Sequence, residues 1–471
     1  MASLPRAFAP LQRSSGAKTL SKLRGDLTQA ECRRLIHSSK QREVSASPFA
    51  ADYRHREQSL QKKVSGLASL PVSQILRTYL ITSISSSPAL LDASSSLLRR
   101  LIDSDNSLAS LDNPVLRAVL WETFYKQFCA GETAEQISSS CEALRQQGYA
   151  GVILEYAREV LKDADGCEAE DVLAWHTGML KSIQLAAPGD FLGLKWSGMG
   201  AAALKRLAAR QDPSPAMHDA MVSVCEAASA KSIALLPSAE ETSTLQGYFA
   251  WSLMMQRLFN RAGKSVVYNT YQAYLRQIPE TLGKHLEVAK QDGFTLGVKM
   301  VRGAYLSSEE RSLLQPSIEA THAAYDGISA ALIHRKYNDV LQSSGSSAFP
   351  DVNVVLATHN AESVRKAREA RQRQADQDQE LTPLCFAQLQ GMADEVSCSL
   401  LAAADRDHSQ AIVEKVYKCT TWGTMTECLN YLLRRAAENK DAASRTADSR
   451  RAMQAELFRR VREVFSIKAS Q

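Results

Sequence analysis

The sequence lacks the features of several large protein classes. Its nine cysteines include no C-x-x-C pair and no Cys/His cluster, which argues against a structural zinc site and a disulfide framework. No uninterrupted apolar run reaches the roughly 18 residues of a transmembrane helix. The motifs G-x-x-x-x-G-K-[ST] and G-x-S-x-G are also absent. We therefore expect a protein of a reducing compartment, soluble or at most peripheral to a membrane.

Positive charge is concentrated at the start of the chain. Residues 1–43 contain nine lysines and arginines against Asp26, Glu31 and Glu43, whereas the 471-residue chain as a whole has a formal charge of +5. A leader rich in Arg and Ser and poor in acid predicts a disordered mitochondrial transit peptide over 1–43, the alternative being a simple basic tail. The near-neutral remainder lacks the clustered cations that bind nucleic acid.

The hydrophobic pattern divides the rest of the chain into three parts. Helical spacing over 60–147 predicts a helical N-terminal region, and the charged segment 441–471 predicts a C-terminal helical tail. Between them, over 148–440, short apolar runs alternate with amphipathic stretches. The eight predicted strands are Val152–Tyr156, Phe191–Trp196, Ser232–Leu236, Ser265–Thr270, Thr295–Val301, Val352–Thr358, Leu384–Leu389 and Glu414–Cys419. Eight strands that alternate with helices favour an α/β fold, a (β/α)₈ TIM-like barrel, over an open doubly wound sheet. The charged segment Ala370–Thr382 resembles an insertion outside the core.

Polar and glycine-rich sequences follow several of these strands. They include Lys195-Trp196-Ser197-Gly198, Arg302-Gly303-Ala304-Tyr305 and Thr358-His359-Asn360. In a barrel the chemistry lies at the carboxyl ends of the strands. Lys195 is costly to bury without an anionic partner, and His359 can be a base, a flavin contact or a structural residue. No second histidine or carboxylate stands at ligand spacing, so we expect no metal.

The segment Glu427–Asn439 has two faces when it is read as a helix. Leu429, Leu432, Leu433 and Ala436 form an apolar stripe, and Tyr431, Arg434, Arg435 and Glu438 form a polar one. Adjacent arginines can bind a carboxylate through paired donors, beside an aromatic ring. The alternative is a solvated helix face with an ordinary ion pair.

Residues Gly198–Ala203 match the dinucleotide-binding pattern G-x-G-x-x-A, and they follow a predicted strand. The fold that uses this pattern places an acidic residue about 20 positions further on, at the end of the next strand. Here the next strand begins only near Ser232. A nicotinamide site is therefore a weak third interpretation.

Five motifs together resemble one known family. VVYNTYQAYL, KMVRGAYL, LATHNAESV, FAQLQGMADEV and YLLRRAAEN occur in the order found in proline dehydrogenases, and the chain is similar to the fungal mitochondrial type. The resemblance implies a distorted barrel that binds FAD and oxidises L-proline to Δ¹-pyrroline-5-carboxylate. It also implies that electrons pass to quinone, on the matrix side of the mitochondrial inner membrane, with peripheral membrane contact.

The resemblance also assigns roles to individual residues. It places Lys195, Arg434 and Arg435 on the substrate carboxylate, and Tyr305, Leu389 and Tyr431 around the pyrrolidine ring. It places Gln272, Lys299, Gly303, Ala304, Thr358, His359, Asn360 and Glu427 along the flavin. The protein would supply orientation and charge, while the flavin accepts a hydride.

Three positions depart from the family pattern. Ser238 stands where an aspartate is usual, so we expect Lys195 to lack a carboxylate partner. Cys419 stands where the family often has a tyrosine, and His322 where an aspartate is common. These departures leave open a related substrate such as hydroxyproline, or a catalytically impaired paralogue with a binding or regulatory role.

Overall fold

The computed structural model describes residues 66–104, 106, 110–157, 167–343, 345, 348–404, 412–438 and 443–468, and the predicted transit peptide lies outside these ranges. The described chain contains one parallel sheet with the strand order β4-β3-β2-β9-β8-β7-β6-β5. Its strands are β2 (Gly151–Tyr156), β3 (Phe191–Leu194), β4 (Ala234–Pro237), β5 (Asn269–Gln272), β6 (Leu296–Val301), β7 (Val352–Ala357), β8 (Leu384–Leu389) and β9 (Lys415–Trp422). Each of the eight predicted strands overlaps one of them.

The two ends of this strand order meet, which closes the sheet into a barrel. Leu235 in β4 forms a parallel bridge with Val267, just before β5. The Leu235 amide donates to the Val266 carbonyl over 2.6 Å, and the Tyr268 amide donates to the Leu235 carbonyl over 3.0 Å. The contact is a single bridge, so the barrel is distorted at this seam. The predicted (β/α)₈ architecture is confirmed, and the open doubly wound sheet is excluded.

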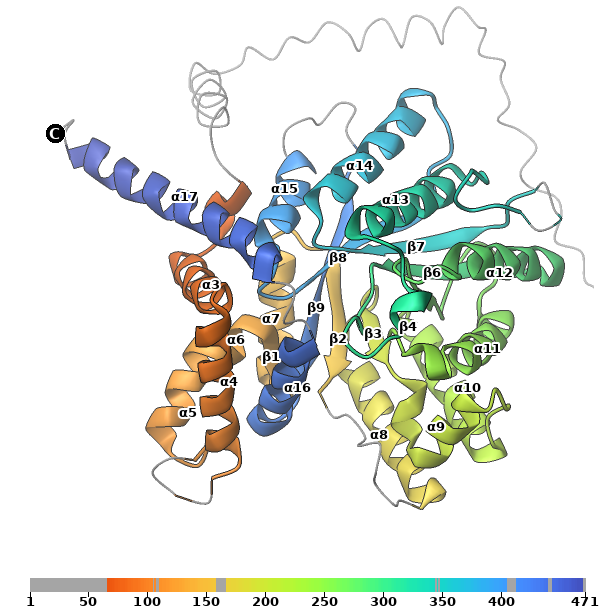
Figure 1. Ribbon diagram of the computed structural model, residues 1–471, viewed down its shortest axis with the longest axis horizontal. Coiled ribbons are helices and arrows are strands. Elements are labelled where there is room, and N and C mark those ends of the chain that lie inside the picture. Colours follow the sequence, from red (N-terminus) through yellow and green to blue (C-terminus); the bar gives the residue numbers. More distant parts are fainter. Residues whose placement is uncertain are drawn as a thin grey trace, which may run out of the picture. The chain divides into compact units, whose positions relative to one another are not determined.

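Helices surround the barrel and follow its strands in turn (Figure 1). They are α8 (Glu168–Leu185), α9 (Ala201–Ala208), α10 (Pro215–Ala230), α11 (Thr242–Phe259), α12 (Ile278–Asp292), α13 (Ile318–His334), α14 (Ala361–Asp376), α15 (Asp394–Ala404) and α16 (Met425–Glu438), with short 3₁₀ turns η3 (Trp196–Met199) and η4 (Arg311–Leu313). Several begin at a side-chain cap: Ser214, Ser317 and Asn360 each accept from the amide three residues further on. No helix among the described residues combines the length and the apolar character needed to cross a bilayer.

The chain before β2 forms additional helices (Figure 1). They are η1 (Gly66–Ser69), α3 (Val72–Ser85), α4 (Pro88–Ile102), α5 (Pro114–Leu120), the π-helical turn η2 (Trp121–Tyr125), α6 (Lys126–Phe128) and α7 (Ala134–Gln146). Of these, α4 and η2 contact α16, and α3 contacts the C-terminal helix. The expectation that this region is wholly helical is wrong in one place. Strand β1 (Cys129–Gly131) pairs with β9 in parallel, and three residues are too few for periodicity to reveal.

The C-terminal helix α17 (Ala443–Lys468) packs along α3. Its Arg460 donates to the carbonyls of Leu67 and Leu70 over 3.0 and 2.8 Å, and its Met453 is fully buried. These contacts connect the end of the described chain to its beginning.

Side chains in the barrel lumen form two layers. Near the amino ends of the strands, Phe191, Tyr268 and Tyr417 pack edge to face. Two residues further along β3 and β9, on the same faces, stand the smaller Gly193 and Cys419. The amino end of the lumen is therefore filled, and the carboxyl end has room for other groups.

The segment Ala370–Thr382 is not an insertion outside the core. Residues up to Asp376 continue α14, and Arg371 and Thr382 are 5 % and 1 % exposed. The Arg371 guanidinium donates to Glu414 at 2.9 Å and to the Thr382 carbonyl at 2.8 Å. Charge composition misled the prediction because a fully paired arginine can be buried.

We expect Arg371→Ala to lower the free energy of unfolding by about 3–5 kcal/mol, because it leaves the Glu414 carboxylate buried and unpaired. Urea denaturation of the purified chain measures this loss. Arg365→Ala on the same helix is the matched control: Arg365 pairs with Glu362 and Glu369 on the surface, and its loss should lower the free energy of unfolding far less than that of Arg371. Equal losses for the two variants would contradict the prediction.

Candidate active site

Three side chains from different loops meet at the carboxyl end of the lumen. Lys195 follows β3, and its Nζ donates to Tyr305 Oη over 3.3 Å. The same Nζ lies 3.7 Å from Glu240 Oε1. Tyr305 in turn donates to the Ala239 carbonyl over 3.0 Å. The loops after β3, β4 and β6 are thus joined around one lysine and one phenol.

Helix α16 adds arginines to this group. Its apolar stripe is buried, with Leu429 and Leu433 packed against the N-terminal helices. On another face, the Arg435 guanidinium lies 5.5 Å from the centre of the Tyr431 ring. Burial raises the pKa of Tyr305, and the charges of Lys195 and Arg435 oppose this shift. Arg434 precedes it on α16; the Glu438 side chain lies outside the described residues.

The predicted flavin residues on β5 and after β6 are in contact with one another. Gln272 is fully buried; its Oε1 accepts from the Ala304 amide over 3.0 Å, and its Nε2 donates to the Glu240 carbonyl over 2.8 Å. A Cβ on Gly303 would lie 2.4 Å from the Tyr274 ring. Gln272 and Gly303 therefore shape the loop that carries Tyr305.

The Thr358-His359-Asn360 sequence forms the turn after β7. The Leu389 amide donates to His359 Nε2 over 3.1 Å, so that nitrogen carries no proton. Asn360 caps α14 through Ser363, and Thr358 accepts from the Asn360 amide over 3.1 Å. The Leu389 side chain is 44 % exposed. His359 thus holds the end of β8 beside the end of β7.

Lys299 and Glu427 have contrasting surroundings. Lys299 is 8 % exposed on β6, and within the described residues it forms no ion pair or hydrogen bond through its ammonium group. Such a buried cation suits a bound group that brings acceptor atoms or negative charge. Glu427 instead accepts from the Thr424 amide at 2.8 Å and from the Tyr156 hydroxyl at 3.4 Å, which stabilises the start of α16.

The replacement of the usual aspartate by Ser238 does not have the expected effect on Lys195. Lys195 does not lose its carboxylate partner, because Glu240, two residues after Ser238, takes that place. Glu240 is 8 % exposed and also accepts from Ser197 Oγ over 3.2 Å. The expectation that Lys195 lacks a carboxylate partner is therefore wrong, because the acid is supplied two residues further along the loop.

His322 lies beside Arg302, a residue to which the sequence analysis gave no role of its own. Arg302 Nε donates to His322 Nδ1 over 3.1 Å, and another of its nitrogens donates to Ser363 Oγ over 2.6 Å. Its guanidinium also donates to Thr358 and stacks 4.3 Å from the centre of the Tyr325 ring. Arg302 thus joins the turn after β6 to the turn after β7.

Two acids also escaped the sequence analysis, Glu155 and Glu240. Glu155 is the penultimate residue of β2, and its Oε2 accepts from Tyr431 Oη over 3.1 Å. The sequence signal for Glu155 was an acidic residue near the end of a predicted strand that is otherwise apolar. Glu240 has no such signal, because it lies three residues beyond the end of its strand.

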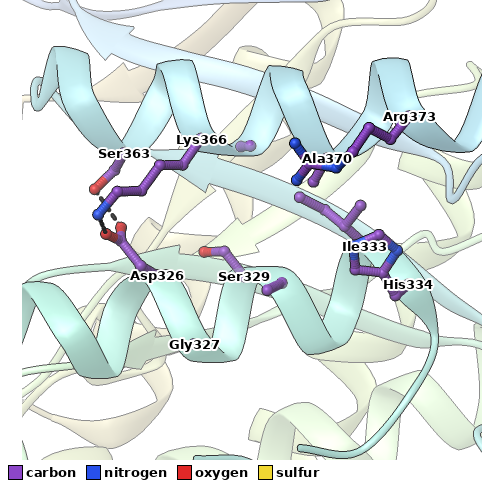
Figure 2. Close-up of a pocket in the computed structure, with 11 residues that line it drawn as sticks. Asp326, Gly327, Ser329, Ile333, His334, Ser363, Lys366, Ala370 and Arg373 are labelled. Atoms are coloured by element: carbon purple, nitrogen blue, oxygen red, sulfur yellow. Dashed lines mark hydrogen bonds and ion pairs between the residues drawn. The ribbon is translucent and has the colours of Figure 1, made fainter.

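A groove of about 370 Å³ lies elsewhere, between α13 and α14. Figure 2 shows Asp326, Ser363 and Lys366 at one end and His334 and Arg373 at the other. None of the predicted site residues lines it. It opens between outer helices, so we do not assign the substrate to this groove.

Together, these elements define an α/β-barrel protein with cations and aromatic rings at the carboxyl end of its lumen. The family model described as proline dehydrogenase matches residues 137–448, a span that includes all of these side chains. The chain belongs to the proline dehydrogenase family.

Individual relatives agree with this assignment. The chain is 27 % identical to a protein named "Proline dehydrogenase 1, mitochondrial" from Arabidopsis thaliana, over 88 % of this chain and 89 % of that protein. It is 34 % identical to a mouse protein named "Hydroxyproline dehydrogenase", over half of each chain. Among solved structures, proline utilization A from Bdellovibrio bacteriovorus shares the fold, with a TM-score of 0.57 at 14 % identity; the match covers 83 % of this chain and 40 % of that longer one.

The His322 contact predicts a pH dependence of stability. Burial and Arg302 lower the pKa of His322, opposed by Asp326 and Glu319, while Lys366 lowers it further. Because the folded state favours the neutral ring, the stabilisation is complete above the ordinary pKa of about 6.5 and is lost as the pH falls below it.

His322→Asn removes this titration, because the Asn oxygen can accept from Arg302 at any pH. We expect the melting temperature of the wild type to fall relative to His322→Asn between pH 7.5 and pH 5. Differential scanning calorimetry of both proteins measures the difference. A difference between the two melting temperatures that stays constant over this pH range would contradict the prediction.

Proposed function

We propose that the protein is an FAD-dependent enzyme that oxidises L-proline to Δ¹-pyrroline-5-carboxylate. The observation that carries the proposal is the hydrogen bond from Lys195 to the Tyr305 phenol, on which the charge of Arg435 also acts, at the end of the barrel where such folds place their chemistry. Membership of the proline dehydrogenase family supports it.

The proposed substrate carboxylate is bound by Lys195, Arg434 and Arg435. Arginine provides paired donors for a planar carboxylate, and lysine adds a point charge. A neutral cyclic amine without the carboxylate would leave these cations poorly compensated, so the site selects an amino acid. The rings of Tyr305 and Tyr431, with the exposed Leu389 side chain, would enclose the pyrrolidine ring.

The residues proposed to hold FAD are Gln272, Lys299, Gly303, Ala304, Thr358, His359, Asn360 and Glu427. The buried Lys299 fits this cofactor, since a flavin ring supplies acceptor atoms that the described protein does not place there. Gln272, Thr358 and Asn360 support the surrounding loops through the backbone contacts described above. Bound FAD supplies a hydride acceptor for the substrate carbon next to nitrogen.

The protein itself contributes orientation and charge. Lys195 donates to Tyr305, so it keeps the phenol oriented while Glu240 balances part of the lysine charge. Transfer of a hydride leaves positive charge on the substrate nitrogen. The Glu240 carboxylate lies at this end of the lumen beside Lys195, and it favours that charge electrostatically.

We place the protein in the mitochondrion, on the matrix side of the inner membrane, with quinone as electron acceptor. The Arabidopsis relative is named mitochondrial, and residues 1–43 have the composition of a transit peptide. Exposed Phe458, Val461 and Phe465 on α17, among several arginines, support peripheral contact with a membrane.

The first prediction from this function is spectroscopic. Anaerobic L-proline should bleach the flavin absorbance of the purified chain, and a quinone analogue should restore it.

We expect Arg434→Ala and Arg435→Ala to lower kcat/KM for proline about 10- to 100-fold, because each removes a charge-assisted hydrogen bond. Arg261→Ala, at an exposed turn, should leave it unchanged.

A flavin band that persists with proline in the wild type would overturn the proposed activity. A bleached band with unchanged kinetics in both arginine variants would keep the activity and overturn the assignment of the carboxylate site. Persistence with every imino acid tested would favour the non-catalytic paralogue.

Hydroxyproline is the second candidate substrate. Cys419 is smaller than the tyrosine usual at this position, and it faces the lumen at the level of the proposed ring pocket. The similarity to the mouse hydroxyproline dehydrogenase points the same way. Parallel titrations with L-proline and trans-4-hydroxy-L-proline decide between them, since the preferred substrate has the higher kcat/KM.

A further inference from the structure

Glu155 is a lumen carboxylate to which neither the sequence motifs nor the proposed chemistry gives a role. It lies on β2, two residues after Ile153, whose side chain packs with Phe191 and Tyr417 in the filled layer of the lumen. Alternation along a strand therefore turns Glu155 into the same lumen, nearer its carboxyl end.

Two donors face this carboxylate. The Tyr431 hydroxyl donates to Glu155 Oε2 over 3.1 Å. Burial and the neighbouring Glu155 raise the pKa of the Cys419 thiol well above its ordinary value, so the thiol keeps its proton and is a second donor. Strand β2 is thus connected to β9 and to α16 through one side chain.

The neighbouring strand leaves space for this arrangement. Gly193 in β3 is paired in register with Glu155. A Cβ on Gly193 would lie 2.3 Å from Glu155 Cγ and 2.5 Å from its Oε1. Distances this short require the Glu155 side chain to move, so a larger residue at 193 would displace the carboxylate from its donors.

We propose that Glu155 is a positioning residue, which holds the Tyr431 ring and the adjoining turn of α16 in place by accepting the Tyr431 hydroxyl proton in a hydrogen bond. The proposal rests on the proposed function, in which Tyr431 encloses the substrate ring. A phenol whose hydroxyl is fixed at one point cannot swing about its Cα–Cβ bond without breaking that hydrogen bond. The ring then keeps the reacting carbon oriented, which affects kcat more than KM.

The kinetic test is a double-mutant cycle with Glu155→Ala and Tyr431→Phe, each with its FAD content and melting temperature measured. We expect each single variant to lower kcat for proline about tenfold with a smaller change in KM. The double variant should be no more than about threefold worse than either, because both changes remove the same contact. Losses that multiply to about a hundredfold would overturn the proposal.

Conservative variants separate the hydrogen bond from the charge. Glu155→Gln retains an oxygen that accepts from Tyr431, and we expect it to keep most of the wild-type kcat. A Glu155→Gln variant as impaired as Glu155→Ala would show that the charge itself is required and would overturn a positioning role. Glu226→Ala, on the exposed face of α10, is the matched control and should behave as the wild type.

A second measurement does not depend on turnover. With 3-fluorotyrosine incorporated at position 431, the fluorine resonance should shift in Glu155→Ala and in Gly193→Ala, and shift less in Glu155→Gln. An unchanged resonance in the two alanine variants would overturn the contact. If wild-type flavin is not reduced by proline or hydroxyproline while these shifts occur, the proposed function fails and the Glu155–Tyr431 contact stands.

Discussion

Charged groups inside a closed barrel must find partners within it, and this constraint organises the candidate site. Lys195, Lys299, Glu155 and Glu240 are drawn from four different strands or the loops after them. Lys299 and Glu240 are buried and the other two are partly buried, so partners from elsewhere in the fold stabilise their charges. Lys195 meets Glu240 and Tyr305, and Glu155 meets Tyr431. Lys299 has no such partner among the described residues, which is why it suits a bound cofactor.

A second set of contacts holds these groups at fixed distances. Arg302 connects the turn after β6 to the turn after β7, and Gln272 connects the end of β5 to the turn after β6. On the outer side of the sheet, Lys418 in β9 pairs with Asp394 at 2.8 Å, both nearly inaccessible to solvent. Side chains that never touch a substrate thus set the shape of the site that would bind one.

The helix α16 combines two structural tasks. Its apolar stripe packs against the N-terminal helices, while its polar stripe directs Tyr431 to Glu155 in the lumen and carries Arg435 beside the Tyr431 ring. The N-terminal region is therefore part of the support of the site. Strand β1 strengthens this connection, since it extends the sheet beside β9 directly before α16.

The sequence by itself determined the barrel, its eight strands and the two faces of α16, because these follow from local periodicity at strand and helix spacing. The five family motifs identified most of the residues at the strand ends. Only the tertiary structure decided which groups pair: Glu240 with Lys195, Glu155 with Tyr431, and Arg371 with Glu414. Such pairs join residues from about 43 to 276 positions apart, and no local pattern records the closure of the barrel that brings them together. A carboxylate in the sequence looks the same whether it will face water or the inside of a sheet.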